Sequence, residues 1–330
     1  MAKKSISVLI AVLFASLTVL PLAAVHAQTA GQGLEISPPL LDLKADPGQT
    51  LQTQIRIRNV TKETLVVKAQ YEDFVASGED GQPKILLNPN EKSPYSIKDW
   101  LNAPASTTLA PEERKTMDVT IKVPKDAGPG GHYGVVRFTG TPPELADTGV
   151  SLSASVGTLV LVNVSGNVTQ SAKIAELFTS QNGKKRSLFE YGPVGITTRV
   201  QNTGNIHFQP KGTVQVTNMF GKNVYVGQLN SDNRNVLPGS IRKFEQTMDK
   251  KMLFGRYTVR ADVVYGADNQ ITSQSISFWV IPYKLIAIVL LALVLIVVIF
   301  RQYNKFIIRR AGNKKNGSKK SKDNSKKASQ

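Results

Sequence analysis

Between about residues 34 and 280 the chain alternates apolar and polar residues over short runs bounded by Gly, Pro, Asn and Asp. This pattern is typical of half-buried β-strands. We predict a first set of strands near Leu34–Ile36, Leu41–Lys44, Gln52–Asn59, Thr64–Phe74, Thr116–Val123, His132–Thr139, Ser151–Ser155 and Thr158–Val164. A second set is predicted near Ala172–Thr179, Val194–Asn202, Gly212–Asn218, Val224–Leu229, Ile241–Met248, Gly255–Tyr265 and Thr272–Val280. This strand number and spacing predict an all-β fold with two tandem immunoglobulin-like β-sandwiches.

Two apolar segments flank this β-rich region. Leu285–Phe300 contains sixteen apolar residues and no charge, which is about 24 Å of helix, and extension back to Val280 gives about 31 Å. We therefore predict a transmembrane helix over residues 280–300, with Trp279 and Tyr283 at the interface and Lys284 snorkelling. A buried core helix is the alternative interpretation.

The N-terminus has the features of a secretory signal peptide. Lys3 and Lys4 precede the apolar segment Ile6–Ala24, and Val25-His26-Ala27 places small residues where a signal peptidase cleaves. We predict a signal peptide over residues 1–27, cleaved after Ala27. A retained N-terminal anchor is the alternative.

The net charge of +17 is concentrated at the C-terminus. Eleven Lys or Arg residues follow from Arg301 onward, against the single Asp323. With +10 in this tail and +2 from Lys3 and Lys4, the stretch from Gln28 to Lys284 carries only +5. That value argues against a nucleic-acid partner.

The basic flank predicts a single-pass membrane protein with the folded region outside the cell membrane and a cytoplasmic tail over residues 301–330. The tail composition predicts disorder, and contact with anionic lipid is a further option.

An internal repeat divides the folded region. In the first half a strand ends at Asn59 and is followed by Leu109-Ala110-Pro111, Arg114-Lys115 and Gly131-His132-Tyr133. In the second half the order is Asn202, Leu237-Pro238-Gly239, Arg242-Lys243 and Gly255-Arg256-Tyr257. We expect each Gly-x-Tyr to bury its ring and direct its hydroxyl to the backbone. The repeat predicts domains over residues 28–170 and 171–279, each with its own core.

The long connection between Phe74 and Thr108 is predicted to be an elaborated crossover with one helical turn over Ser96–Leu101. Ile97 and Leu101 place apolar neighbours beside Trp100. We expect Trp100 to pack on the sandwich core, and a sugar-stacking platform is the alternative.

The residues provide little support for catalysis. The chain has no cysteine and only three histidines, His26, His132 and His207. Glu72 and Asp73 are adjacent on a predicted strand and point to opposite faces, and Glu79-Asp80-Gly81 is expected to be a solvated turn without a calcium ligand series. No Gly-x-Ser-x-Gly motif occurs. We expect no enzyme activity, no cofactor and no metal, so no residue is assigned to a catalytic, cofactor or metal site; an extracytoplasmic hydrolase is the weakest alternative.

Several turn and strand-edge sequences resemble those of the bacterial WxL-interacting proteins. They are Leu41-Asp42-Leu43-Lys44 with Pro47-Gly48, Ile55-Arg56-Ile57-Arg58-Asn59, Val123-Pro124 with Gly130-Gly131-His132-Tyr133, Asn202-Thr203-Gly204-Asn205, Phe220-Gly221-Lys222 and Phe254-Gly255-Arg256-Tyr257. The resemblance implies a cell-surface protein whose first domain binds peptidoglycan or another wall polymer. It also implies a second domain that engages a surface protein partner, and no enzymatic activity. An envelope-assembly chaperone that acts by strand addition is the alternative function.

Overall fold

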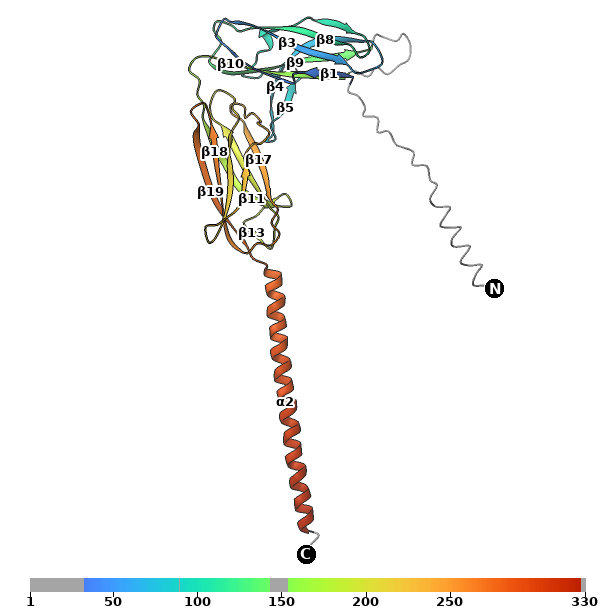
Figure 1. Cartoon of the computed structure of the whole chain (residues 1–330), viewed down its shortest axis with the longest axis vertical. Helices are drawn as coiled ribbons and strands as arrows, with labels where there is room; N and C mark the ends of the chain where they lie inside the picture. Colours follow the sequence, from blue (N-terminus) through green and yellow to red (C-terminus); the bar gives the residue numbers. More distant parts are fainter. Residues whose placement is uncertain (1–32, 89, 143–153, 328–330) are drawn as a thin grey trace, which may run out of the picture.

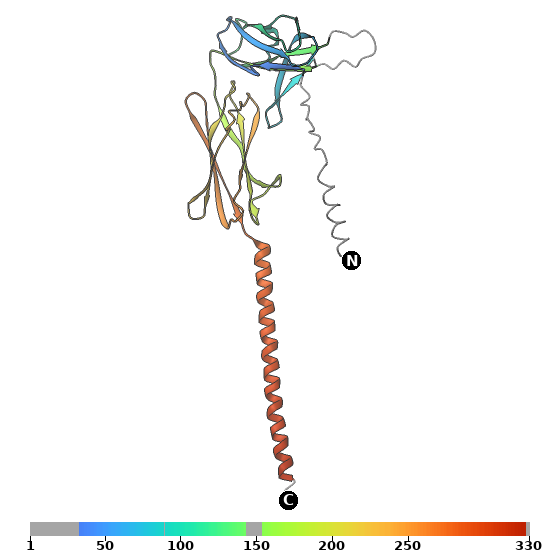
Figure 2. The same cartoon turned by 45° about the vertical axis from the view of Figure 1, so that its right-hand side comes forward.

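The computed structural model of the protein describes residues 33–88, 90–142 and 154–327. The predicted signal peptide and the first residues of the strand predicted at Ser151–Ser155 lie outside these ranges. Two β-sandwiches follow one another along the chain, and a long helix leaves the second sandwich at the end opposite the first (Figure 1, Figure 2).

The first sandwich packs two sheets face to face. One sheet has the order β1 (Leu34–Ser37), β3 (Thr50–Asn59), β8 (Arg114–Lys122) and β6 (Leu101–Asn102). The other has the order β2 (Leu40–Ala45), β10 (Ala154–Val164), β9 (Gly130–Thr141), β4 (Leu65–Ser77) and β5 (Gln82–Leu86), and β7 (Ser106–Leu109) also pairs with β4. Alternate residues such as Ile55, Val119 and Val160 are fully buried between the sheets, because side chains along a strand point to opposite faces.

The second sandwich repeats this architecture. One sheet has the order β12 (Lys184–Lys185), β11 (Ala172–Gln181), β14 (Val194–Asn202) and β17 (Ile241–Met248). The other has the order β13 (Leu188–Phe189), β19 (Gln270–Val280), β18 (Gly255–Tyr265), β15 (Lys211–Asn218) and β16 (Asn223–Gln228). Its core includes Phe189 and Phe278, whose ring centroids are 5.4 Å apart at a steep angle. The predicted all-β fold of two sandwiches is confirmed.

Several details of the first sandwich differ from the predictions, including the short strands β6 and β7, which were not predicted. Residues Gln82–Leu86 form strand β5, which pairs with the end of β4 inside the stretch expected to be a crossover. The two strands expected at Ser151–Ser155 and Thr158–Val164 are a single strand β10 in the described residues. Gly157 lies within β10, where a Cβ atom would come 2.9 Å from Val135, so this glycine permits close packing and does not mark a turn.

Helix α2 runs from Tyr283 to Lys327. Its apolar part, Tyr283–Ile307, is long and apolar enough to cross a membrane, and none of its most apolar stretch is buried against the protein. The buried-core-helix interpretation is therefore wrong. Helix α2 continues through the basic residues to Lys327, and the disorder of the tail stays a prediction.

Candidate functional site

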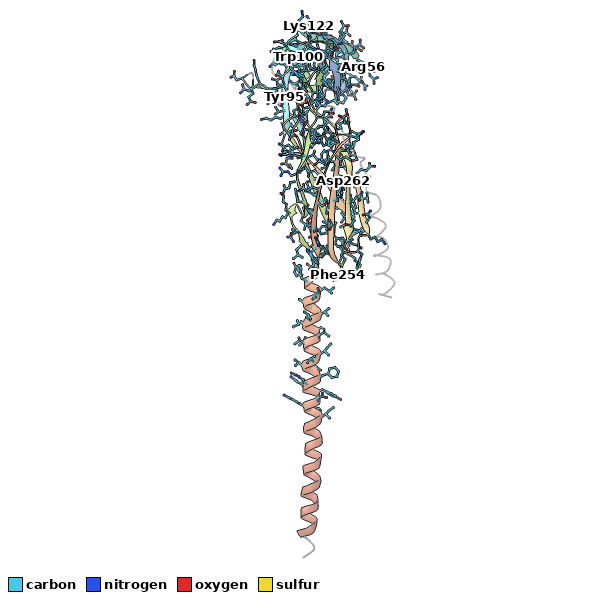
Figure 3. All side chains as sticks on the ribbon, turned by 90° about the vertical axis from the view of Figure 1, so that its left-hand side faces the viewer. Arg56, Tyr95, Trp100, Lys122, Phe254 and Asp262 are labelled. Carbon is cyan, nitrogen blue, oxygen red and sulfur yellow. The ribbon has the colours of Figure 1, made fainter. Side chains whose placement is uncertain are left out.

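In the sheet β1-β3-β8-β6, strands β3 and β8 lie on the side of the first sandwich away from the second sandwich and from α2 (Figure 1), and Arg56 and Lys122 mark this end in Figure 3. Strand alternation places Ile55 and Ile57 in the core and turns the intervening residues outward. All outward residues of this sheet are polar, and we call them the distal face: Glu35, Ser37, Thr50, Gln52, Gln54, Arg56, Arg58, Asn102, Arg114, Thr116, Asp118, Thr120 and Lys122.

Part of the distal face is held by internal polar contacts. Gln54 Nε2 donates to Asp118 Oδ1 across the β3–β8 pair at 3.0 Å. The Arg58 guanidinium donates to the carboxylates of Glu112 and of Glu35, the latter at 3.4 Å. The hydrogen bond to Glu112 is the main cause that raises the pKa of Arg58 above its usual value. Arg58 is thus neutralised by its neighbours.

Three cations of the distal face are free of such neutralisation. Arg56, Arg114 and Lys122 are exposed and form no ion pair with any residue that the structure describes. Arg56 lies opposite Thr116 and Lys122 opposite Thr50, so hydroxyl groups accompany the charges. A flat, rigid surface of guanidinium, ammonium, amide and hydroxyl groups is suited to bind a polymer that carries carboxylate, amide and hydroxyl groups.

Trp100 lies beside this sheet, in the 3₁₀ turn η1 (Lys98–Trp100). The predicted helical turn is confirmed. Trp100 is half-buried against the core of the first sandwich, above the buried side chains of Ile97 and Leu101. Its ring centroid lies 4.7 Å from that of His132. These contacts support the core-packing interpretation, although part of the indole remains accessible.

The acidic turn between β4 and β5 is a contact between the sandwiches, because β5 extends the hairpin until its tip reaches β14 and β17 (Figure 1). Arg199 Nε donates to Glu79 Oε2 at 2.8 Å, and Lys243 Nζ lies 3.1 Å from Asp80 Oδ1. Arg242 Nη2 donates to the Asp80 carbonyl at 2.8 Å. Hydrogen bonds with Glu79 and Asp80 are the leading causes that raise the pKa of Arg199 and of Lys243, respectively. The turn expected at Glu79-Asp80-Gly81 is confirmed and Asp80 is exposed, but its contact with the second sandwich was not expected.

The other two acidic residues that were tested for catalysis also have structural partners. Glu72 pairs with Arg137 at 3.1 Å and with Lys98 at 3.5 Å. Asp73 is buried, and its carboxylate accepts the Ser93 N–H at 3.2 Å. Each carboxylate has its own environment, and the two do not form an acid–base pair.

Tyr133 and His207 form a second contact between the sandwiches. The Tyr133 ring is buried against Phe74 and Leu161, and its hydroxyl accepts the backbone N–H of His207 at 3.0 Å. Burial raises the pKa of Tyr133 far above its usual value, so the hydroxyl stays protonated. His207 Nε2 lies 3.2 Å from Asp42 Oδ2. The other histidine of the described residues, His132, places Nε2 2.8 Å from the carbonyl of Gly128.

The Gly-x-Tyr expectation is confirmed in both sandwiches. The Tyr257 hydroxyl accepts the N–H of Phe254 at 3.1 Å, within its own sandwich. The Tyr133 hydroxyl instead reaches across the junction. The repeat in the sequence indicated the hydroxyl-to-backbone bond, but nothing local to Tyr133 indicated its partner.

Two clefts flank the junction. One of about 220 Å³ has a largely apolar wall that includes Leu40, Phe74 and Leu161, with Arg242 at its edge. The other, of about 390 Å³, is polar and includes Asp42 and His207.

Within the described residues no group of three or more His, Asp or Glu side chains is arranged to hold a metal ion.

Comparisons with known proteins identify the first sandwich. Residues 25–140 match the family described as "WxL Interacting Protein, peptidoglycan binding domain". No curated protein matches the chain. Similar solved structures include the class 5 fimbriae chaperone CfaA, with 16% identity and a TM-score of 0.37 over 76% of this chain and 99% of that chain. The E. coli chaperone DraB has 11% identity and a TM-score of 0.33 over 74% and 96%.

These two structural likenesses are distant, and no functional argument follows from them. The family match, in contrast, covers every strand of the sheet that presents the distal face. The predicted resemblance to the WxL-interacting proteins is therefore confirmed over the first domain of the chain, at residues 25–140.

Proposed function

We propose that the protein is a non-enzymatic, membrane-anchored protein of the cell envelope whose first sandwich binds peptidoglycan through the distal face. The observation that carries this proposal is the family match over residues 25–140, a family described by peptidoglycan binding. Strand β10 lies outside the matched residues, whereas all four strands below the distal face lie inside them.

The chemistry of the distal face fits this ligand. Peptidoglycan consists of acetylated amino sugars with short peptides, and it offers hydroxyl, amide and carboxylate groups. Arg56, Arg114 and Lys122 supply charged donors for the carboxylates, and Gln52 and Thr120 supply donors and acceptors for the sugars. A flat face accommodates a polymeric network better than an enclosed pocket does.

The placement of the helix is consistent with a role at the wall. We propose that α2 spans the cell membrane, with both sandwiches outside and the basic residues after Arg301 in the cytoplasm. The first sandwich is then at the membrane-distal end of the molecule (Figure 2). The second sandwich would engage a surface protein partner, and the tail would contact anionic lipid.

The proposal is tested by sedimentation of the fragment Gln28–Trp279 with purified peptidoglycan. The variant Arg56→Ala/Arg114→Ala/Lys122→Ala should weaken binding at least tenfold, since a hydrogen bond to a charged group contributes about 1.5–3 kcal/mol.

A matched control removes three exposed cations from the second sandwich and should bind like the parent; its substitutions are Lys173→Ala, Lys184→Ala and Arg186→Ala. Equal loss in both variants would indicate attraction by net charge alone. Unchanged binding in both would remove the distal face from the proposal.

A further inference from the structure

Exposed apolar side chains gather at the end of the second sandwich where α2 begins. Phe220 is 85% exposed, Met252 97% and Phe254 66%, which is unusual for large apolar residues of a folded domain. We call the whole group the membrane-proximal collar: Leu188, Tyr191, Met219, Phe220, Met252, Phe254, Trp279 and Tyr283.

Strand pairing brings the collar together from four places in the sequence. Leu188 pairs with Trp279 where β13 joins the end of β19, and Gly255, which follows Phe254, pairs with Val280. The turn after β15 reaches the same end, since a Cβ atom on Gly255 would overlap the Met219 side chain. Figure 3 shows Phe254 at the base of the sandwich, directly beside the start of α2.

Local hydrogen bonds hold these side chains outward. Asn218 Oδ1 accepts the N–H groups of Phe220 and Lys222 at 3.1 and 3.0 Å, and Gly221 takes a positive φ of 77°. This closes a tight turn with the Phe220 ring at its tip. On the neighbouring loop, the Lys251 carbonyl accepts the Gly192 N–H at 3.1 Å, which fixes the segment before Met252.

The charges around the collar are mainly positive. Lys222, Lys250, Lys251 and Arg256 are exposed, and the acidic residues near them are Asp249 and Glu190. Lys284 binds Glu190 at 2.8 Å, which ties the first turn of α2 to the sandwich. Large apolar side chains mixed with lysine and arginine form the composition that sits at the boundary between lipid headgroups and acyl chains.

We infer that the membrane-proximal collar is a lipid-docking surface, which inserts into the headgroup region of the bilayer that α2 spans. The inference rests on the proposed anchor. Only Ile281 and Pro282 separate the last residue of β19 from the first residue of α2. So short a link keeps the collar at the membrane surface, and the occupant that is always within reach is the bilayer itself. The second sandwich would then stand upright, with a fixed orientation.

The test uses the full chain, which has no cysteine, so that a single introduced cysteine can carry a polarity-sensitive fluorophore. Phe220→Cys and Met252→Cys report on the collar. Ile271→Cys is the matched control, because Ile271 is 66% exposed at the opposite end of β19. Leu290→Cys reports on the membrane-spanning part of α2. The proteins are reconstituted in vesicles of phosphatidylcholine and phosphatidylglycerol that contain lipids with a nitroxide on the headgroup.

The inference predicts a blue-shifted emission at positions 220 and 252, and at least about twofold stronger quenching by the nitroxide lipid than at position 271. If the nitroxide lipid quenches the fluorophores at positions 220 and 252 no more than the one at position 271, while position 290 lies inside the bilayer, the inference is overturned and the proposed anchor stands. If position 290 is outside the bilayer, both fail. A blue shift at position 220 that grows with the protein-to-lipid ratio, without quenching by the nitroxide lipid, would show that a second copy of the chain covers the collar. That result would also overturn the inference.

Discussion

Asn59 and Asn202 occupy equivalent places in the two sandwiches, and each is fully buried at the end of a central strand. The Asn59 side-chain amide donates to the Ala110 carbonyl at 3.0 Å. The Asn202 amide donates to the carbonyls of Ile206 and Val236 at 2.7 and 2.9 Å. Each asparagine thereby joins its strand to a turn that is distant in the sequence. This explains why the internal repeat keeps the residue type as well as the spacing.

Substitution of Asn202 by alanine should lower the free energy of unfolding by about 1–3 kcal/mol, because it leaves the Ile206 carbonyl without its donor, whereas the Val236 carbonyl keeps the Phe208 N–H at 3.3 Å. Chemical denaturation of the fragment Gln28–Trp279 measures this loss. Asn223→Ala, at an exposed strand end, is the control and should change little. A loss below about 0.5 kcal/mol at Asn202 would show that water replaces the amide.

Trp100→Ala should destabilise the first sandwich by about 1–3 kcal/mol, less than the roughly 3–5 kcal/mol typical of a fully buried aromatic residue, since the indole is half-buried. Thermal unfolding checks this expectation, with the exposed Leu87→Ala as the control. A variant that melts like the parent but no longer sediments with peptidoglycan would identify Trp100 as a contact residue of the distal face.

At the scale of elements, the alternating pattern predicts most strands to within a few residues. Val194–Asn202, Ile241–Met248 and Gly255–Tyr265 coincide with β14, β17 and β18. Strand β5 was missed because Gln82, Pro83 and Lys84 are exposed and show no apolar alternation; this strand forms by pairing with the extended end of β4. The ion pairs of the acidic turn join residues 120 or more positions apart, so no local pattern indicates them. The distal face was likewise missed, because polar outward residues are typical of any solvated sheet.

The β4–β5 hairpin connects the two sandwiches, and its acidic tip can be neutralised without loss of volume. Glu79→Gln together with Asp80→Asn should broaden the distance distribution between spin labels placed one on each sandwich, while both cores stay folded. An unchanged distribution would mean that the carboxylates are not needed, and that the backbone bonds of the tip together with the Tyr133–His207 contact hold the junction.

The same junction should respond to alkaline pH. Asp80 raises the pKa of Lys243 above the usual 10.5. The contribution of this pair is therefore complete below that value and is lost as the pH rises through the raised pKa. Widening of the label distances above about pH 10.5 in the parent, and not in the doubly neutralised variant, is the expected result. Identical pH responses in the two proteins would contradict it.

At the scale of the whole molecule, unlike surfaces occupy opposite ends of the pair of sandwiches. The distal face is polar and lies far from α2, whereas the collar is apolar and adjoins it. The contacts at the junction hold the sandwiches in one relative orientation, so the membrane and the wall polymer would be engaged from opposite ends. Since Gln28–Lys284 carries only +5, binding to the wall should be moderately sensitive to salt.

The most direct test of the central claim is sedimentation of the separate fragments Gln28–Gln170 and Ser171–Trp279 with purified peptidoglycan. Each fragment contains one large hydrophobic core and its complete sheets, and the cut removes only Leu237 from the small cluster of Phe74, Tyr133 and Leu161. Each is therefore expected to fold alone, which circular dichroism verifies. The first fragment should sediment with the polymer, retain most of its binding at about 0.15 M salt, and lose binding with the three distal-face cations. The second fragment should stay in solution. Binding by the second fragment alone, or loss of all binding by the first at that salt concentration, would contradict the assignment of peptidoglycan binding to the first sandwich.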